Sequence, residues 1–223
     1  DDLEAVRDKG YKVFVFLDCF YLTAQQLKAV ESLRSQNRTL VWFYAPGYAA
    51  QEDLSLARME ALTGFALEPV AEGVLQGTLN ATGEAVGIAK RQKSLFVVRG
   101  GEGVHGLARG VDKLKDKTVM AKKRHPGWTS VFSAIPGVTA DQLRELCRDA
   151  GVHIYCDSGD VLSANESWLM LHTRAAGQKR VTLPKVCKKI TEITTEKVVA
   201  ENTNTFSIDL PKYSTSVFLL EGE

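Results

Sequence analysis

The sequence has few cysteines, few histidines and almost no net charge. Its 223 residues include four cysteines and four histidines, and the formal net charge is +1. No two cysteines form a C-x-x-C pair and no histidines have the H-E-x-x-H spacing, which argues against zinc knuckles, redox dithiols and zinc-protease centres. The sequence therefore predicts no metal site and no cofactor.

Long apolar runs and large basic clusters are also missing. No apolar stretch approaches the roughly 18 residues that a membrane-spanning helix needs. The one basic cluster, Lys122–Arg124, is too short to form the clustered positive surface that nucleic-acid binding requires. We therefore expect neither a membrane nor a nucleic acid as a partner.

The chain begins with a well-marked strand and helix. Residues 3–9 resemble the last turns of a helix, and residues 11–17 form a nearly continuous apolar run, which is typical of a strand covered on both faces. Thr23 is a suitable N-cap, and Gln26 stands three residues later, as in a capping box. A helix is therefore expected after Thr23.

Strand and helix signals continue to alternate to about residue 156. The expected elements are strands at 39–44, 128–135 and 152–156, and helices at 52–62 and 140–150. Gly64 ends the first of these helices, and Thr139 with Gln142 repeats the capping pattern at the start of the second. Such alternation with short links predicts right-handed crossovers and a mostly parallel sheet.

The segment between these two halves is less regular. Residues 65–70 and 95–98 have the composition of strands, whereas residues 79–93 are polar and contain glycine. We expect an exposed hairpin or loop over 79–93 and a flexible connection over the glycine-rich residues 100–106.

Helix signals stop after about residue 160. Short strand-like segments follow, separated by Asn, Gly, Pro and Lys turns, a pattern typical of antiparallel β structure. We therefore expect two domains, an α/β domain over residues 1–176 and a small antiparallel β domain over residues 177–223.

Ligands of open parallel sheets bind at the carboxyl ends of the strands. At these ends the sequence places Asp18 and Cys19 after the first strand, Tyr44 and Tyr48 after the second, and Asp157 after the last. Tyrosines combine a large contact area with a polar tip and suit a sugar or a subunit interface. The two aspartates also fit the role of turn and helix caps. These five residues are the candidate ligand or interface residues.

No residue set predicts catalysis. Cys19 precedes a helix, which can lower a thiol pKa, but its Asp-Cys-Phe-Tyr turn lacks the glycines of a nucleophile elbow. A glycosidase needs two carboxyl groups about 5–10 Å apart, a spacing that sequence alone does not give. We therefore assign no catalytic residue.

Three segments carry a resemblance to a known family. They are YKVFVFLDCFYLTAQQLKAVESLRSQNRTLVWFYAPGYA, GWTSVFSAIPGVTADQLRELCRDAGVHIYCDSGDVLSANESWLMLHT and KRVTLPKVCKKITEITTEKVVAENTNTFSIDLPKYSTSVFLLE. The first two resemble the opening and closing parts of the trimerisation domain of bacterial family 42-type β-galactosidases. The third is similar to the small β domain that follows it. The resemblance is weakest from about residue 70 to 125.

The resemblance implies a class I glutamine amidotransferase-like, flavodoxin-like three-layer α/β fold without the catalytic triad. It implies that the catalytic glutamates of the parent enzyme lie in an N-terminal (β/α)₈ barrel, which alone takes about 250 residues and is absent here. The expected partners are that barrel and further copies of the chain in a trimer that shapes or closes a neighbour's active site. Carbohydrate is a further candidate partner.

The chain opens at Asp1 without Met, and we expect it to be a piece of a longer soluble protein of the bacterial cytoplasm or the secreted or periplasmic space. The parent's glycan stays open. Two alternatives also stay open. One is an amidotransferase-like hydrolase that uses Cys19 or Cys156 with His105, His125 or His153, and the other is a carbohydrate-binding module that uses Tyr44 and Tyr48.

Overall fold

The computed structural model describes residues 3–51 and 53–222, except for the side chain of Glu4. The chain divides into two compact units, the first ending at Val152 and the second beginning at His153. The boundary expected at residues 176 and 177 falls inside the second unit, because β8 (Val161–Ala164) and β9 (Trp168–His172) belong to its sheet.

Parallel strands form one end of the sheet in the first unit. They are β1 (Val13–Phe16), β2 (Arg38–Phe43) and β7 (Trp128–Ser133). β2 pairs in parallel with both β1 and β7. This part of the unit agrees with the parallel sheet that the strand and helix signals predict.

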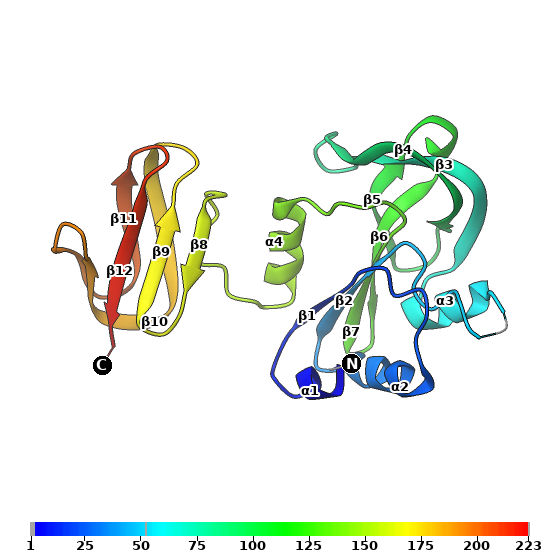
Figure 1. Ribbon diagram of the computed structural model, residues 1–223, viewed down its shortest axis with the longest axis horizontal. Helices are drawn as coiled ribbons and strands as arrows, with labels where there is room; N and C mark the ends of the chain where they lie inside the picture. The colour runs from blue at the N-terminus through cyan, green and yellow to red at the C-terminus, as the bar shows by residue number, and fades with distance from the viewer. Residues whose placement is uncertain (1–2, 52, 223) are drawn as a thin grey trace. The chain divides into compact units, whose positions relative to one another are not determined.

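The remainder of this sheet is antiparallel and closes on itself (Figure 1). Its strands are β3 (Leu67–Leu79), β4 (Ala85–Val98), β5 (Val104–Gly110) and β6 (Thr118–His125). β3 pairs with β4 and β5, and β6 pairs with the same two strands, so the four form a closed ring. The protein is mostly antiparallel β with a closed barrel. The expected flavodoxin-like, amidotransferase-like α/β domain with a mostly parallel sheet is therefore wrong.

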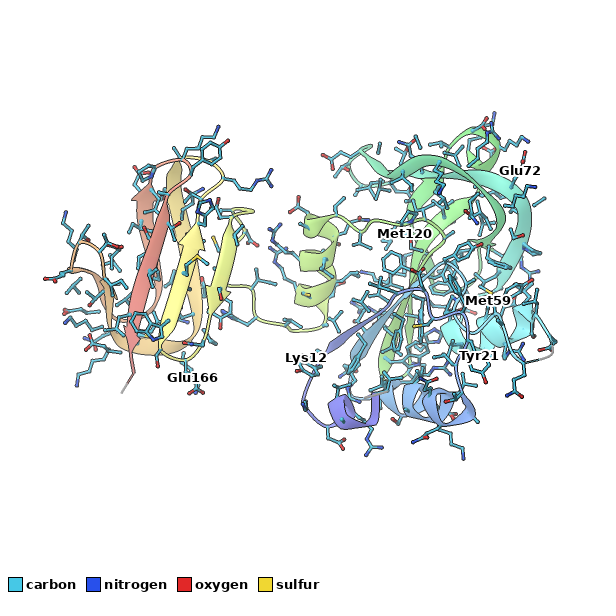
Figure 2. The ribbon with its side chains drawn as sticks, in the orientation of Figure 1. Lys12, Tyr21, Met59, Glu72, Met120 and Glu166 are labelled. Atoms are coloured by element: carbon cyan, nitrogen blue, oxygen red, sulfur yellow. The ribbon has the colours of Figure 1, made fainter. Side chains whose placement is uncertain are left out.

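The sequence pattern does not predict the barrel, because the barrel's water-facing strands carry polar residues. β4 exposes Lys90, Arg91 and Lys93 to water and buries its last four residues, Leu95–Val98. On the outer surface of β3, Glu72, labelled in Figure 2, forms ion pairs with Lys113 and Arg91. Of the hairpin or loop expected at 79–93, the structure has the hairpin: a tight turn after Leu79 joins β3 to β4, and residues 85–93 belong to that long strand.

Gly87 lies at an irregularity of the β3–β4 ladder. The pairing register shifts between Val74, which faces Arg91, and Gln76, which faces Gly87, so Leu75 and residues 88–90 have no regular partner. Gly87 has a φ of +91°, and a Cβ atom there would lie 2.3 Å from the carbonyl oxygen of Leu75. Only glycine fits this bulge without moving the backbone.

The helices α1 (Leu3–Arg7), α2 (Ala24–Leu33) and α3 (Leu56–Thr63) precede the barrel strands. The capping box of α2 is confirmed, since Thr23 and Gln26 exchange side-chain to backbone hydrogen bonds of 2.8 and 3.2 Å. α3 ends at Gly64 with a φ of +75°. Glu52, where this helix was expected to begin, lies outside the described residues.

The core beneath α2 and α3 contains one polar chain. The indole N–H of Trp42 donates to the Ser130 hydroxyl at 3.2 Å, and this hydroxyl donates to the carbonyl oxygen of Thr63 at 2.6 Å. Phe16 stacks on Trp42 with ring centroids 4.2 Å apart. Met59, labelled in Figure 2, is fully buried in the same cluster. The chain of hydrogen bonds ties α3 to both β2 and β7.

The helix α4 (Ala140–Asp149) lies against the other face of the parallel strands. Its capping box at Thr139 and Gln142 is confirmed. Leu146 packs against Val41 and Val131, and the Lys122 ammonium lies 2.7 Å from the Asp149 carboxylate. The strand expected at 152–156 is wrong: those residues are not a strand, because the chain leaves the first unit there.

The second unit contains a five-stranded antiparallel sheet. β8 and β9 are joined in it by β10 (Gly177–Glu192), β11 (Lys197–Leu210) and β12 (Thr215–Glu221). The strand order is β11-β10-β12-β9-β8. Ten buried side chains, including Leu169, Leu171 and Phe218, form its own hydrophobic core.

A buried ion pair anchors the entry into this unit. The Lys179 ammonium lies 2.9 Å from the Asp160 carboxylate, and the two side chains are 6% and 1% exposed. Burial alone would raise the pKa of Asp160. Hydrogen bonds from the Ser158 hydroxyl, the Arg174 backbone N–H and Lys179 outweigh it and hold that pKa below its usual value.

Substitution of Gly87 tests the bulge. We expect Gly87→Ala to lower the free energy of unfolding by about 3 kcal/mol, because it adds a backbone collision to the cost of a positive φ. Gly83→Ala is the matched control, since Gly83 has a φ of +73° with nothing within 4 Å of a Cβ, and should cost about 1 kcal/mol. Urea unfolding measures both, and equal losses would contradict the close approach.

Substitution of Asp160 tests the buried pair. We expect Asp160→Asn to destabilise the second unit by about 3 kcal/mol at pH 7, because Lys179 stays buried without its counter-charge. Urea unfolding followed by NMR separates the units, since the indole N–H of Trp168 reports the second and that of Trp42 the first. Glu221→Gln is the control, because its pair with Lys189 is about 40% exposed and such pairs contribute little.

The same pair predicts the acid response of the second unit. Because the Asp160 pKa is lower in the folded chain, its stabilisation is complete above about pH 5 and is lost as the pH falls below about 4. Asp160→Asn should therefore flatten the fall in the Trp168 unfolding midpoint between these pH values. If the Trp168 unfolding midpoint of the variant falls with pH as steeply as that of the unsubstituted protein, Asp160 does not contribute to the acid response.

Candidate binding groove

A groove of 580 Å³ opens on the sheet face that α4 covers only in part. Its apolar lining comes from strands, loops and helix that are distant in sequence, mainly Val15, Leu17, Val41, Phe43, Ile135 and Leu143. Asp18 and Gln92 add polar groups. We call this hollow the apolar groove. Its volume is within the range of roughly 300–1,000 Å³ that is usual for ligand sites.

Strand alternation builds the groove floor. Phe14 and Phe16 of β1 and Trp42 of β2 belong to the core beneath α2 and α3. Their neighbours Val15 and Val41 line the opposite face, because successive side chains of a strand point to opposite faces. The same apolar run that suggested a strand covered on both faces therefore supplies the groove.

Partial cover by α4 leaves this face open. Leu146 is buried against the sheet, but Leu143, one turn earlier in the helix, is 41% exposed. Leu17 and Val15 are 66% and 46% exposed. Burial of a side chain of this size is worth about 1.5–3 kcal/mol, so the groove holds apolar surface that another group could cover.

Asp18 and Tyr44 border the groove with unusual backbones. Their φ angles are +50° and +61°, values that residues other than glycine seldom adopt. The Tyr44 hydroxyl donates to the Ser94 carbonyl oxygen at 2.8 Å, and its N–H donates to the Ser133 carbonyl oxygen at 2.8 Å. Its ring meets Phe20 edge-on at 5.6 Å. These contacts join the exit of β2 to both β7 and the barrel.

The other expected site residues lie elsewhere. Cys19 is half-buried beside Asp18 and packs against the core. Tyr48 is half-buried, and its ring lies 4.7 Å from that of Phe96. Asp157 belongs to the second unit. The structure thus brings Asp18 and Tyr44 together in the groove, with Cys19 next to them in the chain.

The cysteines have surroundings that disfavour a nucleophile. Burial raises the pKa of the Cys19 thiol, and the Asp18 carboxylate raises it further. The Cys156 sulfur lies 3.0 Å from the Ser158 hydroxyl. Among residues 3–51 and 53–222, no hydrogen bond joins a cysteine to a histidine.

Sequence reasoning missed most of the groove lining. Leu17 ends the apolar run that predicts a strand covered on both faces, and its exposure, like that of Leu143, follows only from the incomplete cover by α4. Gln92 comes from the stretch expected to be an exposed hairpin or loop. The part of the chain that the structure describes contains no group of three His, Cys, Asp or Glu side chains placed for a metal ion. Within it, too, none of the helices has the length and apolar character needed to span a membrane.

The sequence matches no family model and no curated protein. Similar solved structures include a β-galactosidase from Bacillus circulans sp. alkalophilus, with a TM-score of 0.64 and 17% identity over 94% of this chain and 33% of that one. A catalytic mutant of Gan42B, a GH42 β-galactosidase from G. stearothermophilus, has a TM-score of 0.60 and 14% identity over 94% and 32%.

A β-galactosidase from the Antarctic haloarchaeon Halorubrum lacusprofundi has a TM-score of 0.60 and 10% identity over 97% of this chain and 32% of that one. The chain therefore spans about a third of the length of these proteins. At these identities the likeness concerns the fold. Nearly all of this chain shares its fold with one part of a β-galactosidase.

Proposed function

We propose that this chain is a non-catalytic accessory region of a β-galactosidase-like glycoside hydrolase, and that it holds copies of that enzyme together as a trimer. The observation that carries the proposal is the coverage of the fold. At least 94% of the chain corresponds to only about a third of each β-galactosidase, so most of such an enzyme has no counterpart in these 223 residues.

The chemistry of the groove supports a non-catalytic role. Glycoside hydrolysis uses two carboxyl groups about 5–10 Å apart on either side of the sugar bond. Of the described residues that line the apolar groove, Asp18 alone carries a carboxylate. The groove therefore lacks the pair of acids that such a reaction needs.

The apolar groove and the free side of β1 form the proposed self-association face. β1 stands at the end of the sheet order, and edge strands with exposed apolar side chains readily join other chains. Leu17, Val15, Phe20 and Leu143 are each at least 41% exposed around it. Contiguous apolar patches on soluble proteins commonly mark interfaces. Three copies related by rotation would close a ring without leaving a free face.

The geometry does not favour the other two functions considered. A sugar-binding role for Tyr44 and Tyr48 needs open ring faces, but Phe96 contacts both rings and Phe20 also contacts Tyr44. A cysteine hydrolase needs an accessible thiolate beside a base. The raised pKa of the Cys19 thiol opposes that arrangement.

The oligomeric state tests the proposed face. We expect the solution mass, measured by size-exclusion chromatography with light scattering, to rise with concentration toward three times the chain mass. Leu17→Glu should keep the protein monomeric, because a charge would have to be buried at the contact. Leu54→Glu is the matched control, since Leu54 is also 66% exposed and does not line the groove. If the protein is a monomer at every concentration, or if both variants lose self-association equally, this face is not the site of self-association.

Thiol reactivity tests the non-catalytic assignment. Because burial raises its pKa, Cys19 should react with iodoacetamide more slowly than free cysteine at pH 7. Its pH–rate midpoint should lie above about 8.5, the value of an unperturbed thiol. Mass spectrometry of the labelled peptides distinguishes Cys19 from the other three cysteines. Rapid labelling at neutral pH, with a midpoint below that of free cysteine, would favour the hydrolase instead.

A further inference from the structure

A second hollow, of 740 Å³, lies entirely within the second unit. Its lining includes Tyr155, Asn165, Glu166, Leu183, Lys185 and Leu220. We call it the polar groove. It shares no residue with the apolar groove, and its lining combines apolar side chains with an amide, a carboxylate and an ammonium group. A few polar groups around an apolar floor are the usual composition of a small-molecule site.

A large bulge in β10 forms one wall. β10 pairs with β11 up to Thr182, which faces Thr205, and again from Cys187, which faces Thr203. Leu183–Val186 therefore stand opposite the single residue Asn204 and have no regular ladder partner. Pro184 has no N–H to donate, which suits this position. The bulge turns Lys185 outward and leaves Leu183 in the floor.

The turn between β8 and β9 forms the opposite wall. The Asn165 side-chain oxygen accepts hydrogen bonds from the backbone N–H groups of Ser167 and Trp168, at 2.9 and 2.8 Å. The Ser167 carbonyl oxygen accepts from the Leu220 N–H at 2.8 Å. These bonds fix the turn and commit the Asn165 oxygen, so its amide nitrogen is presented as a donor.

The polar groups at the rim are free to bind a ligand. In the described part of the chain, no hydrogen bond or ion pair uses the Asn165 amide nitrogen, the Glu166 carboxylate or the Lys185 ammonium. Glu166, labelled in Figure 2, is exposed at this turn. Tyr155 is half-buried against the core and lines the same hollow.

We propose that the polar groove binds a neutral oligosaccharide. Sugar hydroxyls both donate and accept hydrogen bonds, which matches amide and ammonium donors beside a carboxylate acceptor. The apolar C–H face of a sugar ring fits Tyr155 and the aliphatic floor. The opposite charges of Glu166 and Lys185 balance, so the groove favours a neutral ligand over an anion. An extended peptide would need a longer free strand edge than the four-residue bulge provides.

Titration of the full chain with neutral sugars tests the site. The probes are lactose, β-1,4-galactobiose and cellobiose. Binding of each is monitored by the shifts of the amide NMR resonances. We expect at least one probe to bind with a Kd on the order of 1 mM, and to shift the resonances of residues 155, 165–168 and 183–187. This result does not depend on the oligomeric state, so the proposed trimer can fail while this site holds.

Two conservative variants test whether the ligand binds in the polar groove. Asn165→Asp keeps the oxygen that caps the turn and removes the amide donor, so affinity should fall about fivefold with unchanged thermal unfolding. Glu166→Gln should weaken binding similarly. Glu196→Gln, at the exposed β10–β11 turn, is the control and should leave binding unchanged. Absence of binding up to tens of millimolar, shifts confined to the first unit, or equal affinity in all variants would each overturn the proposal.

Discussion

The first unit depends on β6, the strand shared by the barrel and the parallel strands. β6 pairs antiparallel with β7 along Met120–His125 and with β5 along Thr118–Lys123. Both sides of the strand are therefore occupied, and the barrel closes without a free edge. Closure is the most complete way for a sheet to satisfy its backbone hydrogen bonds. The open edge of the whole sheet is then left at β1, at the end of the strand order.

The barrel also accounts for the uncovered apolar face. In a doubly wound fold, further strands and crossover helices would cover both faces of the parallel strands. Here the chain forms the barrel between α3 and β7, and α4 is the helix packed on the second face. Leu146 is buried beneath it, while Val15 and Leu17 stay exposed. Exposed apolar surface at an open strand edge is physically suited to contact between copies of the chain.

Local signals in the sequence predicted local structure well. The capping boxes at Thr23 and Thr139 need only four consecutive residues, and both are confirmed. The barrel depends on pairing between distant strands, and water-facing residues such as Lys90 hide its period. Asp18 and Tyr44 could be predicted in the groove because strand ends meet at one edge. The exposure of Leu143 could not, since it depends on how much of the sheet α4 covers.

The segment after α4 belongs to the second unit by its contacts. The Thr182 N–H donates to the Tyr155 carbonyl oxygen, and His153 contacts the Thr182 carbonyl oxygen, both at 2.8 Å. Five residues after Tyr155, Asp160 is held by Lys179 and the Arg174 N–H. The backbone of Tyr155 is thus fixed by bonds to the sheet, and its side chain packs against the core of the second unit. A side chain packed in this way loses little freedom when a ligand contacts it, so the segment that enters the second unit also pre-organises the floor of the polar groove.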